Sequence, residues 1–105
     1  RQRQVAMGGV AQAMRKAQFV VTNPTHFSVA LAYDPNEAAA PVVLAKGRGE
    51  KALAMRELAA ELDLPVLEYP ALARSLYYTT RERQMIRDRT FKERVEMARQ
   101  ELSAL

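Results

Sequence analysis

Two short runs of apolar residues near the start of the chain predict a pair of β-strands. They span residues 18–23 and 26–33, and in the second run large apolar side chains recur at every other position from Phe27 to Tyr33. Alternation of this kind is typical of a strand with one buried face. The residues at 23–26 that join the two runs have the length of a tight turn. We therefore expect an antiparallel hairpin here.

The next segment combines strand-like and helix-like patterns. Residues 41–45 form a third apolar run, and because every one of them is apolar we expect this strand at the centre of the sheet, covered on both faces. Residues 50–62 show the periodicity of an amphipathic helix. Its expected apolar face comprises Ala52, Leu53, Met55, Leu58, Ala59 and Leu62. A short fourth strand is predicted at 65–68, and the strand–helix–strand order predicts that the third and fourth strands are parallel neighbours.

Two further helices are predicted in the second half of the chain. Pro70 is favoured in the first turn of a helix, and the apolar residues after it recur with helical spacing as far as Tyr77. From Tyr78 the sequence is more polar until Phe91, where apolar residues begin to recur at intervals of 4, 3, 4 and 3 as far as Leu105. This spacing predicts an amphipathic last helix.

The first residues of the chain show a weaker pattern. Apolar side chains lie near helical spacing there, but Gly8-Gly9 interrupts them, and glycine inside a helix costs about 1 kcal/mol relative to alanine. We expect residues 1–17 to form a frayed linker helix and residues 18–105 to form one globular domain. The predicted fold class is α/β, with a small mixed four-stranded sheet flanked by about four helices.

The composition narrows the possible chemistry. With 105 residues, of which 49% are hydrophobic, the chain can build one modest core. It has no cysteine and one histidine, which excludes disulfides and argues against a zinc site, so we expect neither a metal nor a cofactor. No apolar run approaches the roughly 20 residues that span a bilayer. Because the chain begins at Arg1 rather than Met, we expect it to be a fragment.

The net charge of +4 is distributed unevenly along the chain. Residues 1–18 hold four basic side chains and no acidic one, residues 19–80 hold five basic and seven acidic ones, and residues 81–105 hold seven basic and five acidic ones. A basic first segment is compatible with nucleic acid or with an anionic lipid surface. No aromatic residue is interleaved with these charges for stacking on bases, so we favour a solvated helix surface and expect no nucleic-acid partner.

The predicted hairpin turn, Asn23-Pro24-Thr25-His26, has an unusual chemical property. Asparagine usually degrades when the backbone nitrogen of the next residue attacks its side chain, but Pro24 has no N–H and closes that route. The side-chain amide nitrogen of Asn23 can instead attack the carbonyl carbon of the same residue. This attack closes a succinimide ring and releases Pro24 as a new N-terminus. Good intramolecular orientation is worth roughly 7–11 kcal/mol in reactions of this kind.

The other two residues of the turn can assist such a reaction. His26 is the only histidine in the chain, and an imidazole can transfer protons near neutral pH. Thr25 can form a hydrogen bond within the turn. The same residues are also typical of an ordinary surface turn, because Asn-Pro often begins turns and a single histidine in a turn is commonly just exposed. The turn alone therefore leaves self-cleavage and a plain connection open.

A longer stretch of the chain resembles a known family. Residues 20–27, Val-Val-Thr-Asn-Pro-Thr-His-Phe, are similar to the cleavage segment of the FlhB/YscU family of type III secretion, and the resemblance continues through residues 40–47, 65–68 and 72–77. It covers roughly residues 18–88. The four-residue motif is moderately specific, whereas the motif followed by these blocks in the same order is highly specific.

The resemblance implies a self-processing switch domain on the cytoplasmic face of the bacterial inner membrane, preceded by a membrane region of several helices. Such a domain is not a turnover enzyme. It cuts itself once between Asn23 and Pro24, with Asn23, Pro24, Thr25 and His26 as the catalytic turn, and the cut accompanies a change in the class of exported substrate. The implied partners are export substrates, a ruler protein and other components of the export gate, in a flagellum or an injectisome.

One alternative and two departures from the family accompany this expectation. The alternative is a passive docking module that binds the same partners without needing cleavage. Tyr69-Pro70-Ala71 stands where the family pattern leads us to expect a proline pair, and the tail after Asp88 is more charged than an apolar ending. The departures leave the packing of the last helix, and the choice between flagellar and injectisome branches, open.

Overall fold

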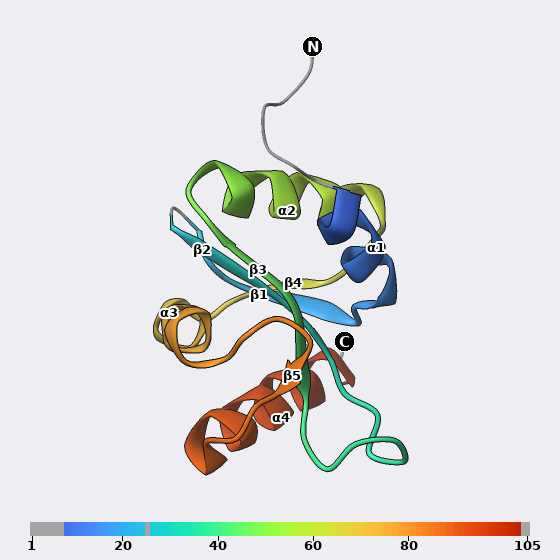
Figure 1. Cartoon of the computed structure of the whole chain (residues 1–105), viewed down its shortest axis with the longest axis vertical. Coiled ribbons are helices and arrows are strands. Elements are labelled where there is room, and N and C mark those ends of the chain that lie inside the picture. Colours follow the sequence, from blue (N-terminus) through green and yellow to red (C-terminus); the bar gives the residue numbers. More distant parts are fainter. Residues whose placement is uncertain (1–7, 25, 104–105) are drawn as a thin grey trace.

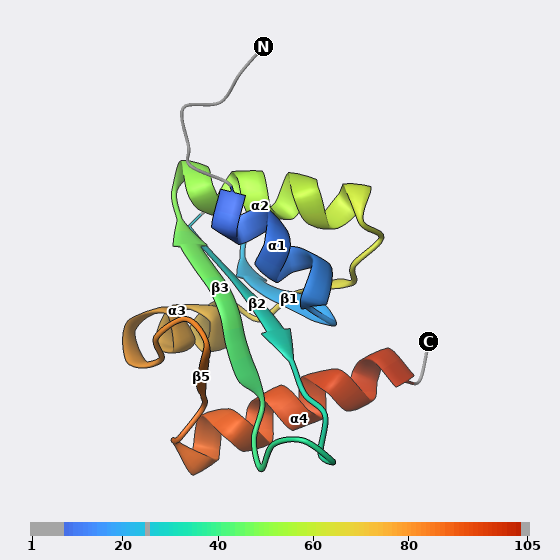
Figure 2. The same cartoon turned by 45° about the vertical axis from the view of Figure 1, so that its right-hand side comes forward.

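The computed structural model describes residues 8–24 and 26–103, and this part of the chain forms four helices around one sheet of five strands (Figure 1). In chain order the elements are α1 (Gly8–Lys16), β1 (Phe19–Asn23), β2 (Phe27–Ala32), β3 (Val42–Arg48), α2 (Glu50–Glu61), β4 (Val66–Glu68), α3 (Pro70–Thr79), β5 (Gln84–Met85) and α4 (Arg89–Ser103). Helices α1 and α2 cover one face of the sheet, and α3 and α4 cover the other (Figure 2).

The sheet is mixed, which confirms the predicted α/β class. Its strand order is β4-β1-β2-β3-β5, with a parallel pair between β1 and β4 and antiparallel pairs elsewhere. The fifth strand was not predicted, because β5 comprises only Gln84–Met85 and carries no apolar alternation. It joins the sheet through backbone bonds at the edge of β3, where the Arg83 N–H donates to the Val43 carbonyl over 2.6 Å and the Ile86 N–H donates to the Pro41 carbonyl over 2.9 Å.

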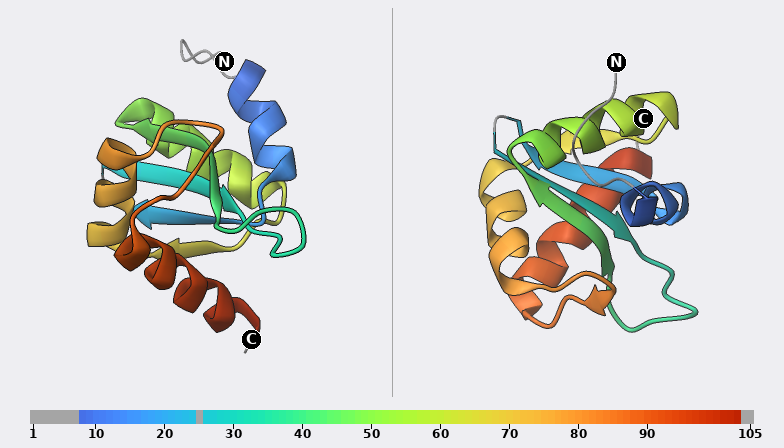
Figure 3. Two further views of the ribbon diagram at one scale, coloured as in Figure 1. Left: turned by 60° about the horizontal axis from the view of Figure 1, so that its bottom comes forward. Right: turned by 45° about the horizontal axis from the view of Figure 1, so that its top comes forward.

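The predicted pairing of the third and fourth strands is wrong. Strand β4 lies beside β1 instead, where the Val20 N–H donates to the Pro65 carbonyl over 2.9 Å and the Tyr69 N–H donates to the Thr22 carbonyl over 3.0 Å. The reason is that β2 and β5 occupy the two edges of β3, whereas β1 has β2 on one edge only. Helix α2 therefore carries the chain across β2 and β1 to the free edge (Figure 3).

The most deeply buried strands are β1 and β2 rather than β3, which corrects the expectation that residues 41–45 form the centre of the sheet. Alternate residues of β1 enter two separate cores: Phe19 and Val21 face α3 and α4, and Val20 faces α1 and α2. In β3 the burial alternates between half-buried and buried positions. A register shift between β2 and β3 leaves Leu44 without an opposite residue, so the buried Val43 and Ala45 face opposite sides.

The two terminal helices pack against these cores. A frayed linker helix was expected over residues 1–17, but in α1 the side chain of Met14 is fully buried between the sheet and α2. Gly8 and Gly9 are both part of this helix. In α4 the side chains of Val95 and Ala98 are buried against the other core, as the predicted periodicity requires. Residues 1–7 and Leu105 lie outside the described residues.

The prediction for residues 50–62 is confirmed except on one side of the helix. Ala52, Met55 and Ala59 of α2 are buried against the sheet. Leu53, which was expected on the apolar face, is 40% exposed. Ala54 is buried instead, so three of the four buried residues of α2 are alanines, which let the helix approach the sheet closely. Among the described helices, none combines the length and the apolar character that crossing a membrane requires.

Because α2 packs closely against β3, Gly47 of this strand has no room for a larger side chain. A Cβ atom at this position would lie 2.7 Å from Lys51 Cγ and 3.0 Å from Met55 Sδ, which is closer than side-chain carbons pack. Gly47→Ala is therefore expected to lower the free energy of unfolding by about 1–3 kcal/mol, the usual cost of overpacking a core. Urea unfolding followed by circular dichroism measures this change.

Gly9→Ala is the matched control for that experiment. A Cβ atom at Gly9 would meet nothing within 4 Å, so this variant should be neutral or slightly more stable, because alanine restricts the unfolded chain. Equal unfolding midpoints for the two variants would contradict the tight contact between α2 and β3.

Candidate functional site

The residues at 23–26 form the predicted tight turn. Asn23 and Phe27 are opposite one another in the β1–β2 ladder, and the His26 N–H donates a hydrogen bond to the Asn23 carbonyl oxygen over 2.9 Å. Asn23 and Pro24 are half-buried and His26 is exposed. The fourth predicted site residue, Thr25, lies outside the described residues.

A row of residues across three strands places a basic side chain near this turn. Asn23 is opposite Phe27 in one ladder, and Phe27 is opposite Arg48 in the next. Directly opposite residues project to the same face of a sheet. The Gly49 N–H donates to the His26 carbonyl over 3.0 Å, so the end of β3 is tied to the turn by the backbone.

The turn borders a hollow of about 460 Å³ between the sheet and α3. Asn23, His26, Phe27, Arg48, Gly49, Arg74 and Tyr78 line it. Arg74 and Tyr78 are four residues apart on α3 and therefore project from the same side of that helix. The hollow thus brings together Asn23 and two arginine residues from different elements.

Three aromatic rings form one wall of this region. The ring of Phe27 lies 5.0 Å from that of Tyr77 and 5.6 Å from that of Tyr78, measured between centroids, and the two tyrosine rings are 5.2 Å apart. The His26 ring is tilted against Phe27 with centroids 6.2 Å apart. Such tilted and edge-on contacts are favourable arrangements for aromatic pairs. Tyr78 is 60% exposed, so this wall also presents an aromatic surface to solvent.

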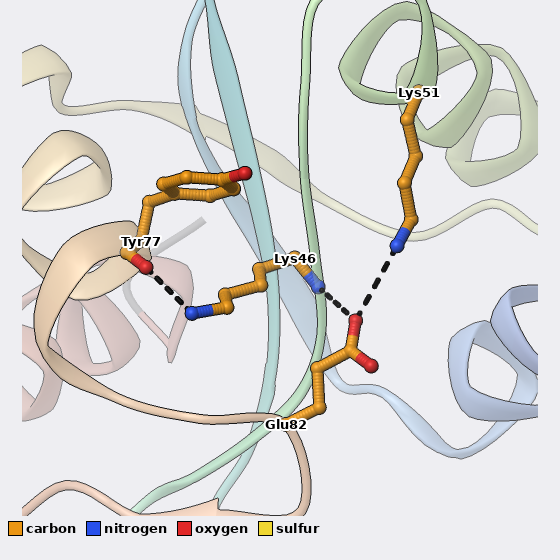
Figure 4. Close-up of polar contacts among 4 residues, drawn as sticks. All are labelled: Lys46, Lys51, Tyr77 and Glu82. Atoms are coloured by element: carbon orange, nitrogen blue, oxygen red, sulfur yellow. Dashed lines mark hydrogen bonds and ion pairs between the residues drawn. The ribbon is translucent and has the colours of Figure 1, made fainter.

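A polar cluster behind the aromatic wall fixes α3 relative to β3 (Figure 4). The Lys46 ammonium donates to the Tyr77 carbonyl over 2.6 Å and lies 5.0 Å from the centroid of the Tyr77 ring. A cation near a helix C-terminus complements the helix dipole. The Glu82 carboxylate accepts from the Lys46 N–H over 3.1 Å and from the Lys51 ammonium over 3.5 Å, which ties the segment after α3 to β3 and to α2.

The sequence pattern indicated the turn but missed the residues that α3 and β3 contribute. Arg48 is the last residue of β3, which extends beyond the predicted strand at 41–45 and is followed by Gly49 with a positive φ of 60°. Arg74 and Tyr78 lie 51 and 55 positions after Asn23, and no local pattern links such residues to the turn. Within the described ranges, no three His, Asp or Glu side chains lie together as metal ligands.

The amino-acid sequence of the chain matches a known protein family over most of its length. The family described as FlhB HrpN YscU SpaS matches residues 1–99. The chain belongs to this family. The assignment confirms the resemblance drawn from the turn and the blocks that follow it.

Curated relatives from several bacteria share much of the chain. The flagellar biosynthetic protein FlhB of Salmonella typhimurium is 53% identical over 76 residues, which cover 72% of this chain and 20% of that protein. The hypersensitivity response secretion protein HrcU of Ralstonia nicotianae is 52% identical over 66 residues, which cover 63% of this chain and 18% of that protein. The chain therefore spans about a fifth of the length of these relatives, and the FlhB HrpN YscU SpaS family serves protein export in both flagellar and secretion systems.

Solved structures of family members have the same fold. A mutated EscU C-terminal domain is 37% identical with a TM-score of 0.79, and the match covers 86% of this chain and 89% of that one. The cytoplasmic domain of FlhB from Shewanella putrefaciens is 34% identical with a TM-score of 0.77, covering 88% of this chain and 70% of that one. Both matches support the α/β architecture described above.

Proposed function

We propose that the chain is the cytoplasmic switch domain of a type III protein export component and that it cuts itself once, between Asn23 and Pro24. The observation that carries this proposal is the 2.9 Å hydrogen bond from the His26 N–H to the Asn23 carbonyl oxygen. This carbonyl group belongs to the peptide bond that would be cut, so the hydrogen bond polarises it. Residues 1–17 would connect the domain, residues 18–105, to a preceding membrane region, and α1 is the packed part of that connection.

The proposed reaction is an intramolecular attack rather than a hydrolysis by a bound water. Nδ2 of Asn23 bonds to the Asn23 carbonyl carbon, and negative charge develops on the carbonyl oxygen. The His26 N–H already donates to that oxygen, so it would stabilise the charge without rearranging. One donor of this kind is typically worth about 10²–10³ in rate. Pro24 then leaves as a secondary amine, and a succinimide remains at Asn23.

The proposed roles of the other turn residues follow from their positions. The exposed His26 side chain can exchange protons with solvent and would move the proton from the attacking nitrogen to the departing one. Pro24 closes the competing route through its missing N–H and restricts Asn23 to extended backbone angles. Thr25 would support the turn by hydrogen bonding. Since each molecule is consumed in the reaction, the domain is not a turnover enzyme.

The cut would act as a switch by changing the surface around Pro24 and His26 while the sheet remains. We propose that this change alters which class of export substrate the gate accepts, with export substrates, a ruler protein and neighbouring gate components as partners, at the cytoplasmic face of the inner membrane. The exposed ring of Tyr78 beside the turn favours a second candidate, a passive docking surface for these partners that needs no cleavage.

Asn23→Ala should abolish cleavage while leaving the fold intact, because alanine has no amide nucleophile. An EscU domain in which an asparagine is replaced by alanine keeps the same fold with a TM-score of 0.79, which supports the choice of variant. Denaturing mass spectrometry should find residues 1–23 and 24–105 as separate masses in the wild-type chain and one mass of about 11.8 kDa in the variant. A single mass for the wild type would favour passive docking, and cleavage of the variant would exclude the succinimide route.

His26→Ala should slow cleavage without abolishing it. The variant keeps both the Asn23 amide and the backbone N–H at position 26, and loses only proton transfer by the imidazole, which is typically worth 10²–10⁴ in rate. Cleavage rates measured by mass between about pH 5 and pH 9 test this expectation. A rate equal to that of the wild type throughout the range would restrict His26 to a structural role.

The two products should remain in one particle after the cut. Residues 1–23 keep side chains buried in both cores, and each contributes roughly 1.5–3 kcal/mol by burial. They are Val10, Met14, Ala17, Phe19, Val20 and Val21. Size-exclusion chromatography of the cleaved chain should give one peak that contains both masses. Separate elution of the shorter piece in native buffer would mean that the switch acts by dissociation.

A further inference from the structure

The hollow beside the turn is positively charged. Arg48 and Arg74 line it with His26, and no acidic residue does so. Neither guanidinium forms an ion pair with another described residue. Three other hollows of the described structure each include a carboxylate, from Glu82, Glu101 and Asp88 respectively. Two permanently charged side chains thus line the same hollow as Asn23, and no carboxylate side chain lines it with them.

The proposed cleavage would supply such an anion at this place. The bond from the Asn23 carbonyl carbon to the Pro24 nitrogen breaks as Nδ2 bonds to that carbon, and one proton passes from Nδ2 to the Pro24 nitrogen. Water then opens the succinimide at one of its two C–N bonds and leaves one carboxylic acid and one amide on residue 23. Carboxyl groups of chain ends titrate at about 3.3–3.7, so this acid is ionised near neutral pH.

We propose that Arg48 and Arg74 form a receptor for the carboxylate that the cut creates at Asn23, and that this ion pair fastens the new chain end to β3 and α3. The inference rests on the proposed self-cleavage and identifies the group that the hollow receives. Before the cut residue 23 is a neutral asparagine. The electrostatic attraction between residue 23 and the two arginines would therefore arise only after the reaction.

The geometry suits this role. Asn23 and Arg48 are separated only by Phe27 in the cross-strand row, a distance of two strand spacings or about 10 Å between backbones, which an arginine side chain can largely span. Arg74 approaches from α3, and the planar guanidinium groups can each donate two parallel hydrogen bonds to a carboxylate. Arg74 is held in place because Lys46 fixes the C-terminal turn of α3 to β3.

The retention of residues 1–23 in the cleaved chain tests the receptor. The double variant Arg48→Gln, Arg74→Gln should lose this piece about three- to tenfold faster than the wild type in moderate urea, as expected for two partly exposed ion pairs. Loss is followed by size-exclusion chromatography with mass detection and is scored on cut molecules only. The difference should disappear in about 1 M NaCl, where the screening length is about 3 Å.

Two controls separate the ion pair from general effects. Arg81→Gln removes the same charge from an exposed position outside the hollow and should leave the rate of loss unchanged. Adding Arg48→Gln and Arg74→Gln to the uncut Asn23→Ala chain should not shift its urea midpoint, because no carboxylate is present there. If the two substitutions lowered the urea midpoint of this uncut chain, the faster loss of residues 1–23 would be explained by a weakened fold. That result would overturn the receptor.

A second measurement needs no cleavage. Asn23→Asp introduces a carboxyl group at the same position, and an EscU domain in which asparagine is replaced by aspartate keeps the fold with a TM-score of 0.77. The pKa of this carboxyl, followed by NMR, should lie below the ordinary value of about 3.9 and return toward it when both arginines are glutamine. If the wild-type chain shows a single mass, the proposed cleavage itself is wrong. If the chain is cut but neither the retention of residues 1–23 nor the pKa of the carboxyl changes when the two arginines are replaced, only the receptor is wrong.

Discussion

The antiparallel ladder between β1 and β2 is the constraint on which the rest of the structure depends. Both strands are buried on both faces, and their alternate side chains supply the centres of the two cores that α1 and α2 cover on one side and α3 and α4 on the other. The turn between them is held by the bond from the His26 N–H to the Asn23 carbonyl. The ladder therefore positions Asn23 at the end of β1 and, through Phe27, places Arg48 on the same face of the sheet.

How much of the fold the sequence could predict depended on how local each interaction is. The hairpin, α2 and α4 followed from patterns within single segments, and all three lie where the patterns placed them. The position of β4 could not be predicted in this way. A strand can pair only with a free edge of the sheet, and which edges are free depends on every other strand. Strand β5 was missed for a related reason: its two residues are held by backbone bonds to β3 rather than by apolar side chains.

The same distinction applies to the site. Asn23 and Pro24 could be singled out because their chemistry lies in adjacent atoms of the chain. Arg48 and Arg74 could not, because a basic residue between two glycines and another on the outer side of a helix are both typical of solvated surface. Only the cross-strand row and the docking of α3 bring them to the turn. Sequence chemistry thus predicted a reactive bond, which stays a prediction, and tertiary packing shows which residues surround it.

The proposed cut at the tip of this hairpin would change the local charge without removing buried contacts. The segment that ends at Asn23 carries α1 and β1, whose buried side chains belong to both cores, so it has two independent reasons to remain in place. The proposed cut would remove the covalent restraint on the turn and would add a carboxylate on residue 23 and a secondary ammonium on Pro24. Opposite charges would then stand where a neutral bond stood, and the hollow lined by Arg48 and Arg74 includes Asn23, the residue that would carry the carboxylate. In the proposed reaction the carboxylate end would be drawn toward β3 and α3 while the cationic Pro24 end would be repelled, so the two ends would separate along a direction that the fold determines.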